Sequence, residues 1–273
     1  TLPGGDDLPV VGKGTYKLEG EDVKDAVSIA LDTGYTHIDT AEGYMNEEAI
    51  GEVLPEYDRE DVFLTSKVLA KNLNYESVLD SAETTLEKLG TDYLDLYLIH
   101  WPNPAISIRE TMNAMATLTR RGLVRNVGVS NFSRYQLSVA QHVSDVDIAV
   151  NQIEYHPWYQ RPKLREYCLA NDVVIEAAAP LARTEVLSDP TIENLAEKYD
   201  KSPAQIVLRW EIEKDVVVLP RSTSKAHIEA NFDLFDFSLA EADIERIDDL
   251  DREYPVYDDR VRTWDDEVWG ISR

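Results

Sequence analysis

Basic residues and cysteine are both scarce in this chain of 273 residues. Lysine and arginine together number 27 against 52 acidic residues, which gives a formal net charge of -25. Such a charge repels nucleic acid phosphates and anionic membrane surfaces, so we expect neither as a partner. The single cysteine, Cys168, excludes an internal disulfide and any cysteine-based metal cluster, as is typical of a reducing compartment.

Long hydrophobic runs are also missing. No stretch approaches the roughly 18 uninterrupted apolar residues of a membrane-spanning helix. The first ten residues, TLPGGDDLPV, lack the basic and apolar regions of a signal peptide. We therefore predict a cytoplasmic protein.

The acidic residues are spread along the whole chain and do not form a tail. This distribution leaves two interpretations open. One is an enzyme from a salt-rich cytoplasm, where salt screens the repulsion among carboxylates, and the other is an ordinary acidic protein. We favour the first, which predicts that salt stabilises the fold.

Short β-rich runs alternate with amphipathic stretches over the length of the chain. The β-rich runs lie at 35–40, 61–67, 93–100, 124–131, 147–152, 173–180, 215–222 and 232–239. Between them, segments such as 46–57 and 75–90 carry apolar residues at helical spacing. This alternation predicts eight parallel strands covered by helices, and no low-complexity linker divides residues 1–273 into more than one domain.

Two α/β architectures fit this alternation, an open doubly wound sheet and a closed (β/α)8 TIM barrel. An open dinucleotide-binding sheet normally carries GxGxxG after its first strand. Here the glycines of VGKGTY lack that spacing. The barrel is therefore the favoured fold, and the length of the chain permits it.

Polar residues stand at or just after the ends of five predicted strands. They are Asp39, Lys67, His100, Ser130 with Asn131, and Gln152. Taken singly, Asp39 fits a turn cap and His100 fits a buried core histidine, but a buried Lys67 needs a counter-charge, which Asp39 offers. Because the carboxyl ends of barrel strands share one rim, we predict that these residues meet in a functional mouth.

Six segments carry a resemblance to a known family. They are IDTAEGYMNEE, LTSK, LIHWPNP, GVSNF, NQIEYHP and LPRS, and they occur in the family's order. In this the chain resembles the aldo-keto reductases from near residue 10 to beyond residue 235. The resemblance implies a barrel with a C-terminal substrate loop that passes hydride between NAD(P)H and an aldehyde or ketone. It also implies a catalytic tetrad of Asp39, Tyr44, Lys67 and His100.

The chemistry of the reaction suits those four residue types. Reduction of a carbonyl builds negative charge on oxygen, so the site must supply a proton, and Tyr44 is the candidate acid. A free phenol has a pKa near ~10, and the Lys67 ammonium would stabilise its ionised form. Asp39 would keep Lys67 charged, while offsetting part of its field on Tyr44. His100 would orient the carbonyl oxygen or relay the proton.

Hydride transfer requires a nicotinamide beside this cluster. By the resemblance, Ser130, Asn131 and Gln152 bind its carboxamide, although turn capping also explains the first two. The adenosine half is assigned by the resemblance to Arg221, Ser222, Thr223, His227 and Asn231, where a capped helix is the alternative explanation. His227 stands where the family often has an arginine that faces the 2′-phosphate of NADPH. Histidine is mostly uncharged near neutrality, so we expect NADPH to be preferred but NADH also to be used.

The chain departs from the family pattern in the cofactor site. Ala178 stands where an aromatic ring commonly lies under the nicotinamide, and the sequence does not reveal a substitute. Ala230 replaces a common glutamate, and Arg221 a common lysine.

We predict that four aromatic residues line an apolar pocket for a small carbonyl substrate. They are Tyr16, Trp101, Tyr155 and Trp158, with Trp264 or Trp269 added from the C-terminal loop.

Two other functions compete with this hypothesis. One is a non-catalytic, cofactor-binding regulator on the same barrel, against which the intact tetrad argues. The other is a metal-dependent hydrolase, but the five histidines are not spaced as a ligand set, so we expect no metal. The oligomeric state stays open, and a monomer is compatible with the sequence.

Overall fold

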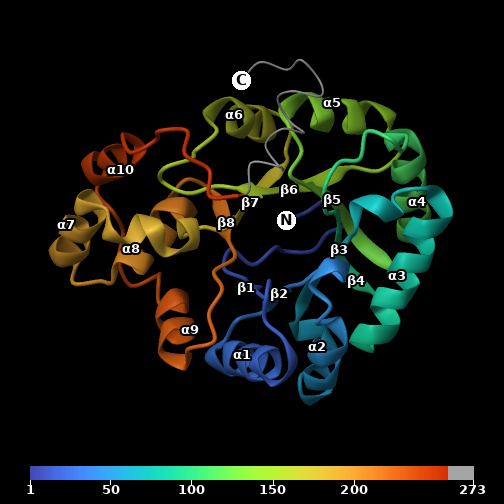
Figure 1. The fold of residues 1–273 in the computed structure, drawn as a ribbon, viewed down its shortest axis with the longest axis horizontal. Helices are drawn as coiled ribbons and strands as arrows, with labels where there is room; N and C mark the ends of the chain where they lie inside the picture. Colours follow the sequence, from blue (N-terminus) through green and yellow to red (C-terminus); the bar gives the residue numbers. More distant parts are fainter. Residues whose placement is uncertain (258–273) are drawn as a thin grey trace.

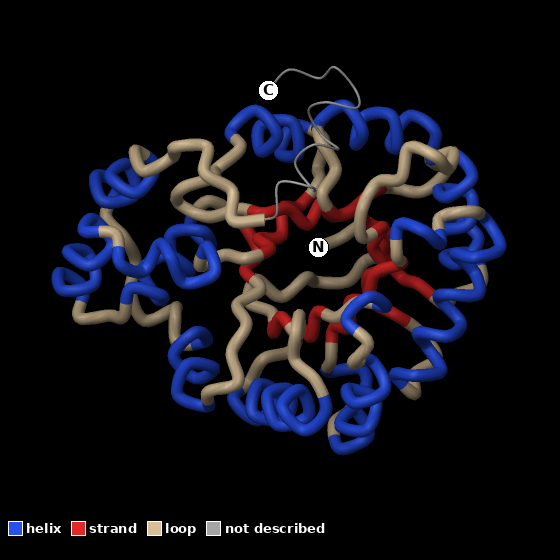
Figure 2. The backbone as a smooth tube through the Cα atoms, viewed as in Figure 1, coloured by secondary structure: helices blue, strands red, loops and turns tan. Residues whose placement is uncertain are grey.

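A closed barrel of parallel strands forms the centre of the protein in a computed structural model that describes residues 1–257. Neighbouring strands pair in chain order from the first to the eighth. The strands are β1 (Lys13–Gly14), β2 (His37–Asp39), β3 (Phe63–Val68), β4 (Leu94–Ile99), β5 (Val124–Ser130), β6 (Ile148–Glu154), β7 (Val174–Ala178) and β8 (Val216–Val218). Figure 2 shows them as an inner ring with helices outside.

Helices connect successive strands and surround the barrel (Figure 1). They are α1 (Gly20–Thr33), α2 (Glu47–Val53), α3 (Tyr75–Leu89), α4 (Ile108–Arg120), α5 (Arg134–Val143), α6 (Pro162–Ala170), α7 (Pro190–Tyr199), α8 (Pro203–Glu213), α9 (Lys225–Phe232) and α10 (Glu241–Asp248). Within residues 1–257, none of them is long and apolar enough to cross a membrane.

Local sequence explains where several helices begin and end. Ser133 before α5 and Ser202 before α8 each accept a hydrogen bond from the backbone N–H three residues on. The glutamine side chain at that position accepts one from the backbone N–H of the serine, which completes a capping box. α3 begins after the Asn74 cap and ends at Gly90, whose φ of 64° suits glycine. These signals fix the helix ends that set strand spacing.

The predicted eighth strand is wrong, and the true additional strand is β1. Residues 232–239 are rich in apolar residues interrupted by polar ones, yet they form no strand. Side chains of α8 hold this segment instead: Gln205 donates to Asp233 O, and Arg209 donates to Leu234 O. The barrel closes between β1 and β8, where Val11 bridges Val218 in parallel.

An apolar cluster fills the barrel near the ends where the strands begin. It includes Leu2, Phe63, Leu96 and Val150, all buried. A larger apolar core lies between the barrel and its helices. The apolar cluster leaves polar side chains of the strands to gather at the opposite end of the barrel.

Candidate active site

The four predicted catalytic residues lie together at the ends where the strands finish. Asp39 ends β2, Lys67 lies in β3, and His100 follows β4. Tyr44 ends a 3-10 helix, η1 (Glu42–Tyr44), which follows β2. Consecutive strands thus bring residues from distant parts of the sequence to one place.

Lys67 is the centre of this cluster. Its Nζ donates to Asp39 Oδ1 at 2.7 Å, to Asp39 Oδ2 at 2.8 Å and to Thr40 O at 2.8 Å. It also donates to the Tyr44 hydroxyl at 3.4 Å. Lys67 and Asp39 are both buried, so each charge depends on the other for compensation.

Burial holds the proton on Tyr44. It raises the pKa of the phenol well above its ordinary value, and the charge of Asp39 and the neighbouring Tyr16 raise it further. Lys67 therefore does not lower the pKa of Tyr44 below that of a free phenol in this structure, because desolvation and Asp39 outweigh its field. The group is in its acid form at neutral pH.

His100 is neutral for the same reason. Burial lowers the pKa of its imidazole to about 3, and Lys67 contributes to the lowering. The ring lies edge-on to Tyr44, with centroids 5.5 Å apart. An uncharged imidazole can donate from only one nitrogen, so it can orient an oxygen without adding a charge.

The predicted carboxamide-binding residues are linked to this cluster by hydrogen bonds. Ser130 Oγ donates to Gln152 O at 2.9 Å, and Asn131 Nδ2 donates to His100 O at 3.0 Å. Gln152 Nε2 donates to Asp39 Oδ2 and to Glu176 Oε2, both at 2.9 Å. The three residues are thus brought together.

Glu176 on β7 was not singled out in the sequence. It is fully buried, and burial raises the pKa of its carboxyl to about 8, with Asp39 adding to the effect. Its signal was visible, because Glu176 is an acidic residue inside an apolar strand run, as Lys67 is a basic one.

A cavity of about 280 Å³ opens onto the cluster. Asp39, Tyr44 and Gln152 line it, and so do the loops that follow β7 and β8. It extends to Arg221, whose Nη1 donates to Tyr16 O at 3.3 Å. A long ligand can therefore lie with one end beside Tyr44 and a negatively charged part beside Arg221.

The predicted adenosine-binding residues lie on the loop after β8 and on α9. Ser222 Oγ accepts from Ser224 N at 3.1 Å, which shapes the loop. Thr223 and His227 are exposed, whereas Asn231 is buried. The donors of this loop and its exposed cation fit the phosphate of a dinucleotide.

The predicted substrate residues do not all reach the cavity. Tyr16 lines it, and Trp101 lies beside it, with its ring 6.3 Å from that of Tyr257, which also lines the cavity. Tyr155 is instead in the core, stacked on Trp210 with centroids 5.5 Å apart. Trp158 is buried, and its carbonyl accepts from the backbone of Arg252 and Tyr254. Trp264 and Trp269 lie outside the described residues.

Tyr155 and Trp158 therefore do not line the cavity, contrary to the prediction that they form the substrate pocket. The Tyr155 ring stacks on Trp210 of α8, and the Trp158 ring lies under the Arg252 guanidinium, 3.7 Å from its centroid.

Tyr257 was missed in the sequence, since nothing in its neighbourhood marks it. Glu154 positions it: Oε1 accepts from Val256 N at 2.5 Å, and Oε2 accepts from Tyr257 N at 3.2 Å. The same cavity is lined by Ala178, where the expected aromatic ring is absent. Tyr257 and Tyr16 are the aromatic rings among the described lining residues besides Tyr44.

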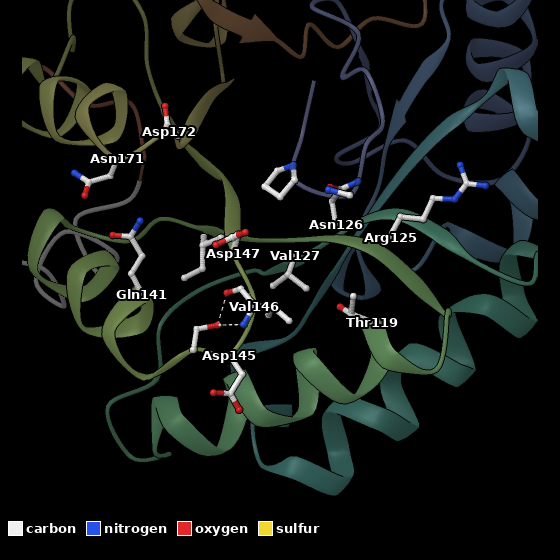
Figure 3. Close-up of a pocket in the computed structure, with 14 residues that line it drawn as sticks. Thr119, Arg125, Asn126, Val127, Gln141, Asp145, Val146, Asp147, Asn171 and Asp172 are labelled. Carbon is white, nitrogen blue, oxygen red and sulfur yellow. Dashed lines mark hydrogen bonds between the residues drawn. The ribbon is translucent and has the colours of Figure 1, made fainter.

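A second hollow, of about 650 Å³, lies where β5 and β6 begin (Figure 3). Arg125 is paired with Asp6 and Asp95 at 3.1 and 3.4 Å. Catalytic groups of barrel enzymes gather at the other end, and nothing here resembles the cluster around Lys67. Within residues 1–257, no group of three or more His, Cys, Asp or Glu side chains is arranged to hold a metal ion.

Comparison with known proteins identifies the family of the chain. The model of the aldo/keto reductase family matches residues 10–252. The chain belongs to this family. The glyoxal reductase of Bacillus subtilis is 38% identical over 270 residues, which cover 98% of this chain and 96% of that protein. Aldose reductase B of Dictyostelium discoideum is 37% identical and covers 89% of each chain.

Solved structures agree. An aldo-keto reductase from a Medee basin deep-sea metagenome library has a TM-score of 0.92 and 37% identity, covering 94% of this chain and 96% of that one. An aldo-keto reductase of Bombyx mori in complex with NADP has a TM-score of 0.90 and 33% identity, covering 97% and 95%. This aldo/keto reductase is an NAD(P)H-dependent oxidoreductase with a (β/α)8 barrel fold, and the reductase names of its relatives do not favour a non-catalytic regulator.

Proposed function

We propose that this enzyme reduces small aldehydes and ketones with NADPH, using Tyr44 as the proton donor. The hydrogen-bonded series Asp39–Lys67–Tyr44 at the base of the cavity carries the proposal. The cofactor would supply hydride when bound. The residues of the chain would bind the carbonyl oxygen, protonate it and balance the resulting charge.

Each residue has a distinct part in this scheme. Tyr44 holds its proton at neutral pH and gives it to the oxygen as negative charge develops there. The Lys67 ammonium, 3.4 Å from the phenol oxygen, then stabilises the phenolate that remains. Asp39 keeps Lys67 charged, and neutral His100 donates a hydrogen bond that orients the carbonyl oxygen.

The cofactor would lie along the cavity from Tyr44 to Arg221. Gln152, with Ser130 and Asn131 beside it, would bind the carboxamide. Arg221, Ser222, Thr223, His227 and Asn231 would bind the adenosine half. His227 offers less charge to a 2′-phosphate than an arginine does, so NADH would also serve as a reductant, with lower efficiency.

Tyr16, Trp101 and Tyr257 surround the outer part of the site with aromatic surface. This surface favours a substrate with an apolar face next to its carbonyl group. Dicarbonyls and sugar aldehydes, which the names of the relatives suggest, are the first compounds to test.

A panel of aldehydes and ketones tests the proposal, with oxidation of NADPH and of NADH followed by absorbance. We expect turnover with both reductants and a higher kcat/KM with NADPH. The proposal is wrong if no carbonyl compound in the panel is reduced with either cofactor.

A further inference from the structure

Lys13 on β1 is a buried cation that the proposed mechanism does not use. Lys13 is only 1% exposed, and its Nζ donates a hydrogen bond to Ser222 O at 2.5 Å. Over residues 1–257 it pairs with no carboxylate, although the chain carries 52 acidic residues. Lys67, the other fully buried lysine, has Asp39. A buried ammonium without a counter-charge is unfavourable unless an anion compensates it at some stage.

The surroundings of Lys13 are positive. Arg221, exposed and without a carboxylate partner in the described part of the chain, faces it from the loop after β8. On α9, Lys225 and Glu229 pair with each other at 3.8 Å, and on β2 Asp39 is held by Lys67. Among residues 1–257, no negative group therefore offsets the two cations in this corner.

Strand β1 and the loop after β8 touch closely at this point. Gly14 N donates to Pro220 O at 3.2 Å, and a Cβ on Gly14 would lie 2.8 Å from Leu219 O. The loop then leads into α9, where Ser224 caps the first turn by accepting from His227 N. The positive end of the helix adds to the attraction for an anion.

Burial lowers the pKa of Lys13 to about 7, and the charge of Arg221 contributes. The side chain is therefore largely neutral in mildly alkaline solution. An anion that binds beside Arg221 would favour the charged form and draw a proton onto Lys13.

We propose that Lys13 is a buried cation of the site for the cofactor's 2′-phosphate. It holds the loop of Arg221 through the carbonyl of Ser222 and takes up a proton when the phosphate binds. The phosphate monoester of NADP(H) carries nearly two charges at one point, whereas NAD(H) lacks it. Lys13 thus supplies the positive charge that His227 does not, and it links the choice of cofactor to pH. This inference rests on the proposed function.

Calorimetric titration with NADP⁺ and with NAD⁺ tests it, in two non-phosphate buffers of different ionisation enthalpy. At about pH 8 the 2′-phosphate is already a dianion, because its second pKa is near ~6, so it neither binds nor releases a proton. We expect the wild type to take up roughly half to one proton per NADP⁺ bound and much less per NAD⁺.

Variants locate the proton. Lys13→Met should abolish the uptake and weaken NADP⁺ binding by about tenfold, while NAD⁺ binding changes by less than about twofold. Lys225→Met is the matched control: it removes a charge from the same region, but this lysine is exposed and paired, so the uptake should persist.

The results separate the inference from the function beneath it. NADP⁺ binding without proton uptake in the wild type overturns the role of Lys13, whether or not Lys13→Met folds. Equal weakening for both dinucleotides in Lys13→Met shows a merely structural lysine and also overturns it. Failure to bind either dinucleotide overturns the proposed function itself, and this inference with it.

Discussion

Where the strands of the barrel begin, Leu2, Phe63 and Leu96 fill the interior, and the ion pair of Arg125 with Asp6 lies at the surface. Where the strands finish, Lys67 and Glu176 are fully buried beside Asp39. Apolar packing stabilises the first end, whereas the second end keeps ionisable groups out of water, which is unfavourable for their charged forms. The difference supports a division in which one end stabilises the fold and the other carries the proposed chemistry.

Removing one basic side chain from each end should give the largest difference in the free energy of unfolding. Lys67→Met leaves Asp39 as a buried carboxylate without its cation, so the free energy of unfolding should fall by about 3–5 kcal/mol. Arg125→Met at the other end should lose less than about 1 kcal/mol, because Arg125 is partly exposed and Asp95 keeps Arg59 at 2.7 Å. Urea denaturation of both variants measures this, and equal losses would contradict the comparison.

The next largest effect concerns a hydroxyl group at each end. Tyr44→Phe should lower turnover at least ~100-fold and leave cofactor binding intact, since it removes the proposed proton donor. Tyr93→Phe is the matched control near the start of β4, where the hydroxyl has no hydrogen-bond partner among the described residues, and its turnover should change less than about twofold. Near-normal reduction by Tyr44→Phe would end the assignment.

Replacing a carboxylate by an amide should change the free energy of unfolding in opposite directions at the two ends of the barrel. The folded Glu176 keeps its proton up to about pH 8, whereas the unfolded chain loses it near 4.5, so stability falls as pH rises through this window. Glu176→Gln removes this loss and should be more stable than the wild type by about 1–3 kcal/mol near pH 8.

Asp95→Asn provides the counterpart. It weakens the pair with Arg59 and should be less stable than the wild type by about 1–3 kcal/mol. Thermal and urea unfolding at several pH values measure both variants. A Glu176→Gln protein whose stability falls with pH as steeply as that of the wild type would show that the carboxyl does not titrate as described.

A smaller effect is expected when the charge at residue 227, in the proposed cofactor site, is changed. The wild type should prefer NADPH to NADH by less than ~100-fold in kcat/KM. His227→Arg should widen that gap about tenfold, or roughly 1.4 kcal/mol, because a permanent charge then faces the 2′-phosphate. Paired kinetics with both cofactors decide this. Absolute NADPH specificity in the wild type, or no change in the variant, would remove His227 from the phosphate site.

Salt should have the smallest effect, and it should act on the surface. Raising potassium chloride from about 0.1 M to about 1 M should raise the melting temperature, because screening relieves repulsion among surplus carboxylates. The stability difference between the wild type and Lys67→Met should stay constant, since a buried pair is screened little. A melting temperature that falls steadily with salt would contradict adaptation to a salt-rich cytoplasm.

The sequence predicted seven of the strands because buried parallel strands appear as short apolar runs. It also predicted where Asp39, Lys67, His100 and Gln152 meet, since strand ends of a barrel share a rim. The apolar run at 232–239 led to a wrong strand prediction, because an apolar pattern does not say whether a neighbouring strand is available for pairing. β1 is two residues long, one of them Gly14, and it is recognisable as a strand only where it pairs with β2 and closes the barrel beside β8.

The sequence alone thus determined the barrel, the meeting of the four predicted catalytic residues and the excess of acidic residues, because periodicity, residue type and charge are local properties. Tertiary structure alone decided that Tyr155 packs on Trp210 while Tyr257 reaches the cavity. It also decided that Lys13 has no carboxylate partner among residues 1–257 and that Glu176 lies against Gln152. Those outcomes depend on which side chains burial brings together and on which of them it deprives of water, and neither is encoded at any single position.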